Sequence, residues 1–87
     1  MGDQELKLLE EQWQGRVRHA KLNLDLCRLY VKQTQALAAD IPPADGGYAF
    51  RRALKSEQSA LAEYTRALRI YSDLVVYGKL PGEAGLP

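Results

Sequence analysis

A seven-residue repeat between Tyr48 and Tyr77 is the feature that most constrains the fold of this chain. Its first row is Phe50, Glu57, Tyr64 and Tyr71, its second row is Ala53, Ala60, Ala67 and Leu74, and its third row is Leu54, Leu61, Leu68 and Val75. These rows correspond to positions a, d and e of a heptad. A period of 3.5 residues that is kept over four repeats predicts a long helix packed lengthwise against another helix.

A helical pattern also covers the first half of the chain. Apolar and small residues recur there every three or four positions, at Leu6, Leu9, Trp13, Val17, Ala20, Leu24, Cys27, Val31, Thr34 and Ala38. Gly15 is the weak point, because glycine inside a helix costs about 1 kcal/mol relative to alanine. The pattern predicts one long helix. The alternative is a break at Gly15, with residues 3–14 folded back to make a three-helix monomer.

The sequence DIPPADGG at residues 40–47 is the one interior cluster of helix-breaking residues. Pro42 and Pro43 disfavour helical geometry at the residues before them, and Asp45 is a candidate N-cap for the next helix. Gly78 is a candidate left-handed C-cap. The sequence therefore predicts an all-α, long antiparallel helical hairpin, with a helix over about residues 3–40, a loop over 41–46 and a helix over about 47–77. Residues 1–80 would form a single domain and residues 81–87 a disordered tail.

Folding the chain about this loop gives a register for the seam between the helices. In it, Ala53, Ala60 and Ala67 face Thr34, Cys27 and Ala20, and Leu74 faces Trp13. The first heptad row would then face Leu37, Tyr30, Asn23 and Arg16. Three polar pairs are expected from this arrangement, namely Glu57 with Tyr30, Tyr64 with Asn23, and Tyr71 with Arg16.

The e positions of both helices flank the same side of an antiparallel seam. They are Val17, Leu24, Val31, Ala38, Leu54, Leu61, Leu68 and Val75. Monomers rarely leave so large an apolar stripe in water, and a two-helix unit has little core of its own. We therefore expect a homodimer that forms a four-helix bundle through these residues. On the other flank, Leu22, Leu26 and Leu29 form a smaller apolar group. It could be ordinary surface, part of the dimer contact in a skewed bundle, or a docking patch for another protein.

The motifs argue against catalysis and against a bound cofactor. Glu57 and Glu63 lie on or beside the seam, but neither is followed three residues later by the histidine of a di-iron bundle. Cys27 has no cysteine or histidine at metal-ligand spacing, and no glycine-rich phosphate loop follows a strand pattern. We expect a non-enzymatic protein that acts through self-association and protein–protein interaction, as a scaffold, adaptor or chaperone-like protein.

The single cysteine favours a reducing, cytoplasmic location, and no apolar run is long enough for a membrane span. The net charge of +1 points to no particular partner. Five basic residues should nevertheless gather near the loop end of the hairpin: Arg28, Lys32, Arg51, Arg52 and Lys55. Such a cluster could hold nucleic-acid phosphates. Nearby acidic residues dilute it and no exposed aromatic residues interleave with it, so nucleic acid is the less favoured partner.

Overall fold

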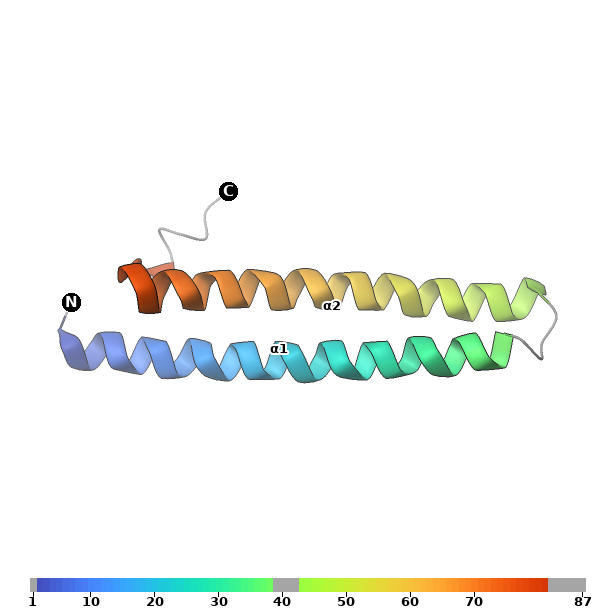
Figure 1. Ribbon diagram of the computed structural model, residues 1–87, viewed down its shortest axis with the longest axis horizontal. Helices are drawn as coiled ribbons and strands as arrows, with labels where there is room; N and C mark the ends of the chain where they lie inside the picture. Colours follow the sequence, from blue (N-terminus) through green and yellow to red (C-terminus); the bar gives the residue numbers. More distant parts are fainter. Residues whose placement is uncertain (1, 39–42, 82–87) are drawn as a thin grey trace.

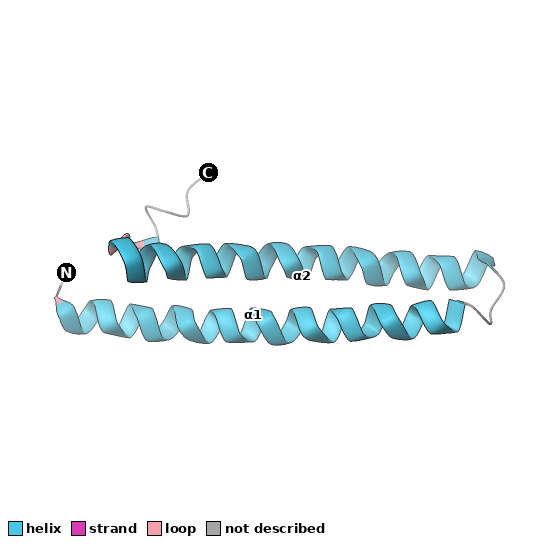
Figure 2. Ribbon diagram, in the orientation of Figure 1, coloured by secondary structure: helices cyan, strands magenta, loops and turns pink. Residues whose placement is uncertain are grey.

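The computed structural model describes residues 2–38 and 43–81. It consists of two long helices, α1 (Asp3–Ala38) and α2 (Pro43–Tyr77). The helices run antiparallel and side by side, in a molecule with extents of 59 × 23 × 14 Å (Figures 1 and 2). The described residues include no strand. The predicted all-α antiparallel hairpin is therefore confirmed.

α2 begins earlier in the chain than predicted. α2 begins at Pro43, four residues before the predicted start at residue 47, so Asp45 lies within its first turn and is not the N-cap. Proline suits the first helical position, because the amide hydrogen that it lacks would have no partner there and its fixed φ is already helical. Residues 39–42, which include the predicted end of the first helix, lie outside the described residues, as do residues 82–87 of the predicted tail.

α1 is continuous through Gly15, so the three-helix alternative is wrong. A Cβ added at Gly15 would meet nothing within 4 Å. The hairpin itself therefore has no steric need for glycine at this position, although glycine weakens a helix. Gly15 is exposed on the surface of the hairpin.

α2 ends in the predicted left-handed cap. Gly78 has a φ of 67°, a conformation that glycine adopts without the strain that a side chain would cause. Its amide donates a hydrogen bond of 3.1 Å to the carbonyl oxygen of Leu74, and the amide of Lys79 donates one of 3.2 Å to the carbonyl oxygen of Asp73. These bonds satisfy carbonyl groups that the end of a helix would otherwise leave unpaired.

The core is the narrow seam between the helices. Its buried apolar residues are Leu24, Ala53, Ala60, Ala67, Ile70 and Leu74. The second heptad row is therefore buried at every layer, as predicted. Thr34 is the buried polar residue of the described chain, and its hydroxyl donates to the backbone oxygens of Tyr30 and Val31 at 3.1 and 3.0 Å. That local bonding lets a polar side chain lie in the seam without an unpaired group.

α1 is rotated about its axis relative to the predicted seam. Leu24 is only 1% exposed, and Val17 and Val31 are half-buried. The row expected to face α2 is exposed instead, at Arg16, Asn23, Tyr30 and Leu37. Each of Val17, Leu24 and Val31 follows a member of that row by one position, about 100° around the helix, so turning α1 about its axis exchanges the two rows. Burying leucine and valine removes more apolar surface from water than burying arginine and asparagine would.

The three expected polar pairs are consequently wrong. Within residues 2–38 and 43–81, no hydrogen bond joins Tyr71 to Arg16, and none forms in the other two predicted pairs. The lengthwise register is nevertheless as predicted. Ala20 and Ala67 line one hollow, and Cys27 and Ala60 line another.

Candidate interaction surfaces

α2 presents an apolar stripe beside the seam. Leu61, Leu68 and Val75 follow one another at heptad spacing and are 44%, 40% and 48% exposed. Leu54, one repeat earlier, is half-buried. We call these four residues the α2 stripe. Val17 and Val31 of α1 are half-buried, and the heptad pattern places them on the same side of the seam.

Of the expected dimer interface, one residue is buried in the seam and the side chain of another lies outside the described part of the chain. Leu24 is enclosed within the hairpin itself, so the expectation that it would be exposed for a second copy is wrong. Its burial follows from the rotation of α1, which moves its row from the flank into the seam. The side chain of Ala38 lies outside the described part of the chain.

α1 carries a second apolar surface on its outer side. Leu22, Leu26 and Leu29 are 63%, 65% and 52% exposed, which confirms that this group is on the surface. Leu8, Tyr30 and Leu37 are also exposed and extend the group along most of the helix. Gly15 falls midway between Leu8 and Leu22 in the same heptad row. We call Leu8, Gly15, Leu22, Leu26, Leu29, Tyr30 and Leu37 the α1 face.

The full length of the α1 face was not predicted from the sequence. Tyr30 and Leu37 were expected in the seam, so only three leucines remained as an isolated group. The apolar periodicity of α1 itself contained the signal, because Leu24 and Leu26 cannot lie on the same side of one helix. Once Leu24 is buried, the leucines two residues before and after it must face outward.

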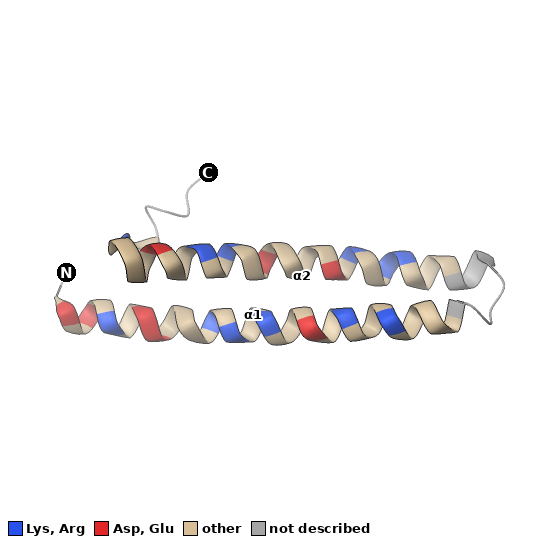
Figure 3. Ribbon diagram, in the orientation of Figure 1, with Lys and Arg blue, Asp and Glu red and all other residues tan. Residues whose placement is uncertain are grey.

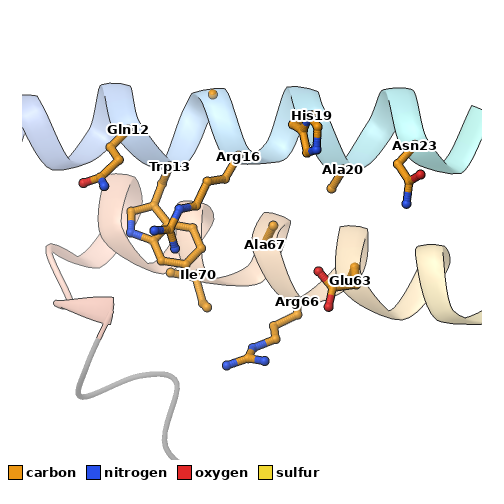
Figure 4. Close-up of a pocket in the computed structure, with 11 residues that line it drawn as sticks. Gln12, Trp13, Arg16, His19, Ala20, Asn23, Glu63, Arg66, Ala67 and Ile70 are labelled. Carbon is orange, nitrogen blue, oxygen red and sulfur yellow. The ribbon is translucent and has the colours of Figure 1, made fainter.

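A hollow of about 600 Å³ lies on the flank of the seam away from the α2 stripe (Figure 4). Gln12, His19 and Glu63 are among the residues that line it. The guanidinium of Arg16 lies over the ring of Trp13, 4.5 Å from its centroid, a cation–π contact. Ile70 also lines the hollow, lies below Trp13 in Figure 4 and is only 5% exposed. Its burial was not predicted, because its heptad row otherwise holds the polar residues Ser56 and Glu63.

The hollow offers few of the features of a reaction centre. In the described part of the chain, neither His19 nor Glu63 makes a hydrogen bond or an ion pair. A general base that activates a nucleophile is normally within hydrogen-bond reach of it. The described residues of the chain contain no group of three or more histidine, cysteine or acidic side chains that could hold a metal ion. Cys27 is half-buried beside Ala60.

The five basic residues lie toward the loop end of both helices and are all exposed (Figure 3). Arg52 and Lys55 border one hollow together with Cys27, but Arg28 and Lys32 do not line it. The guanidinium of Arg52 lies 5.9 Å from the ring centroid of Tyr48. Tyr48 and Tyr30 are both exposed, so the expectation that no exposed aromatic residue interleaves with the basic residues is wrong. Arg51 and Arg52 leave the helix about 100° apart, because they are adjacent in it. The structure brings these residues to one end of the molecule but not to one surface.

Comparisons with protein-family models, with curated proteins and with solved structures found no match for this chain. Neither helix, over its described residues, has an apolar stretch long enough to cross a bilayer. The fold and its surfaces define a helical hairpin with a narrow seam and two exposed apolar surfaces. One of these surfaces is the α2 stripe and the other is the α1 face.

Proposed function

We propose that this chain is a non-catalytic helical interaction protein that associates with itself through the α2 stripe. Two hairpins would form a four-helix bundle, in the manner of a scaffold or adaptor protein. The observation that carries the proposal is the heptad spacing of Leu61, Leu68 and Val75, each of them 40–48% exposed beside the seam. Coiled-coil partners recognise an apolar repeat of this kind.

The strength of this association follows from the apolar area still open to water. Fully burying one aliphatic side chain stabilises by about 1.5–3 kcal/mol. Completing the burial of three half-exposed residues in each of two copies is therefore worth on the order of 5–9 kcal/mol. That gain is comparable with the entropic cost of association, about 4–15 kcal/mol. Because Leu54, Val17 and Val31 add further contact area, we expect a dimer of moderate affinity that depends on concentration.

Light scattering coupled to size-exclusion chromatography tests the proposal directly. We expect a mass near twice the 9.7 kDa of one chain at high concentration, falling toward one chain on dilution. Replacing Leu61→Gln and Leu68→Gln together should abolish this dimer, because polar amides would then occupy the contact. Glutamine and leucine have similar helix propensities, so the helix itself should be retained.

The matched control places the same side chains one position further along α2. Ala62→Gln and Arg69→Gln are exposed substitutions on the outer side of the helix, and they should leave the mass unchanged. A wild-type chain that is well folded and monomeric at roughly 100 μM, the range where moderate interfaces form, would refute the proposed function.

A further inference from the structure

A row of alternating charges borders the α1 face. Its members are Glu11, Arg18, Asp25 and Lys32, and all four are exposed. Each follows a residue of the Leu8, Gly15, Leu22 and Leu29 row by three positions, so the two rows are neighbours on the helix surface. The charges read negative, positive, negative and positive along the helix.

The charges of this row are complementary to those of a second copy of the row that runs in the opposite direction. A second copy of α1 laid antiparallel on the first places Glu11 opposite Lys32 and Arg18 opposite Asp25 in one common register. Two-fold symmetry then repeats both pairs. A parallel copy would instead place like charges opposite each other, which disfavours that arrangement. We propose that the α1 face is a second self-association surface, on which the α1 helix of another copy packs antiparallel.

Gly15 supports this assignment independently of the charges. Nothing in the hairpin occupies the space that its Cβ would fill, and its row holds leucine at the flanking repeats. In the register set by the charge pairs, Gly15 of one copy lies beside Leu26 and Leu29 of the second copy. A missing side chain at that point allows a close approach of backbone to side chain, which is a common reason for glycine inside a regular element.

Asp25 is already engaged within its own helix. Nζ of Lys21 donates to both carboxylate oxygens of Asp25, at 3.1 Å to Oδ1 and 3.2 Å to Oδ2, and the two side chains are each 50% exposed. A carboxylate has about four lone-pair positions, so a half-exposed Asp25 can also accept from Arg18 of the second copy. The Lys21 contact holds the carboxylate of Asp25 in place on the helix surface without occupying all of these positions.

The α1 face is separate from the α2 stripe, and the inferred contact goes beyond the proposed function. Copies that use only the α1 face form a dimer with the two α1 helices at its centre. Copies that use both surfaces join two α2-stripe dimers, and two kinds of two-fold contact can close into a tetramer. The assembly therefore depends on which of the two surfaces is left intact.

Analytical ultracentrifugation of the full chain carrying Leu61→Gln and Leu68→Gln isolates the α1 contact. We expect a monomer–dimer equilibrium that weakens about tenfold on Glu11→Lys, since two opposite-charge pairs become like-charge pairs. Lys32→Glu alone should have the same effect. The combined variant Glu11→Lys with Lys32→Glu should restore the affinity to within about threefold of the parent, because both pairs reform with reversed signs.

Arg51→Glu is the matched control for Lys32→Glu, because it makes the same charge change at an exposed position of α2. It should leave the equilibrium unchanged, and circular dichroism of every variant checks that the helices persist. Absence of dimer in the parent, or a combined variant no tighter than Glu11→Lys, overturns the inference. An α1 face that serves a different protein, or none, gives these same results.

The wild-type chain separates the failure of this inference from the failure of the proposed function. The α1 contact alone is overturned if the wild-type dimer disappears with Leu61→Gln and Leu68→Gln but its affinity is unchanged by the charge variants. A monomeric wild-type chain overturns both.

Discussion

α1 and α2 are nearly equal in length, with 36 and 35 residues, but they contribute very differently to the seam. α2 buries a complete heptad row together with Ile70, whereas α1 buries only Leu24 and Thr34 among its described residues. The buried row of α2 is largely alanine, so the seam is narrow. A narrow seam between two helices covers little of either one, and the remaining apolar side chains lie beside it on α2 and on the outer side of α1.

This difference between the helices explains why the hairpin leaves two apolar surfaces exposed. A helix with a single apolar stripe would be fully used by the seam. α1 carries leucines both in the seam and on its outer side, and α2 carries its exposed stripe next to the buried alanines. Each helix therefore has more apolar surface than one partner helix can cover. Variants that act on one helix but not on the other test this division.

The largest effect is expected from Leu24→Ala. Leu24 is 1% exposed, and removing a buried leucine side chain typically costs 2–5 kcal/mol through lost burial and the cavity left behind. Leu22→Ala is the control two residues away. Since Leu22 is 63% exposed, its loss should change the stability of the monomer by no more than about 0.5 kcal/mol.

Urea unfolding followed by circular dichroism, at concentrations where the chain is monomeric, measures both changes. A loss at Leu22 as large as that at Leu24 would mean that α1 is buried on its outer side as well. The division between a seam side and a free side of α1 would then be wrong.

Ala60→Leu tests the other side of the same seam. Ala60 is 3% exposed and shares a hollow with Cys27, so the larger side chain should force the helices apart. Overpacking of this kind costs about 1–3 kcal/mol. Ala62→Leu adds the same volume at an exposed position and should leave the melting temperature almost unchanged. Equal losses from the two variants would show that α2 is covered on both sides.

The sequence determined the lengthwise register of this seam but not the rotation of α1. The alanine row of α2 differs sharply from its neighbouring rows, so it identifies the buried side of that helix. On α1, the row that contains Asn23 and the row that contains Leu24 are offset by one residue. Folding the chain at the same loop allows either row to face α2. Matching polar residues across the seam selected Asn23, whereas the cost of leaving Leu24 in water favours the other row.

The start of α2 and the extent of the α1 face have related explanations. Pro43 is compatible with both a loop and the first turn of a helix, and the two glycines after Asp45 favour the loop. Tyr30 and Leu37 were assigned to the seam by the same choice that selected Asn23. The exposed positions of Leu61, Leu68 and Val75 were predictable, because the e position of a heptad lies beside the contact line whichever of the two α1 rows is buried.

Gly15→Ala should separate the stability of the helix from that of the assembly. Since a Cβ at this position meets nothing within 4 Å, alanine should stabilise the monomer by about 0.5–1 kcal/mol through the lower conformational entropy of the unfolded chain. The same substitution should weaken association through the α1 face. Unfolding at low concentration and sedimentation at high concentration measure the two effects. Tighter association of the variant would argue against a close contact at Gly15.

The smallest effect is expected at the open end of the seam, where Arg16 was predicted to bond Tyr71 and instead lies 4.5 Å from the ring centroid of Trp13. Arg16→Gln should lower the stability by about 0.5–1 kcal/mol, the usual worth of an exposed cation–π contact. It should also change the fluorescence of Trp13, the one tryptophan of the chain. Tyr71→Phe should do neither, because no hydrogen bond of the described residues uses its hydroxyl.

If instead Tyr71→Phe destabilises the chain as much as Arg16→Gln does, the two side chains interact in solution. The row of Arg16 and Asn23 would then lie closer to α2 than its exposure indicates, with α1 turned toward the seam first predicted.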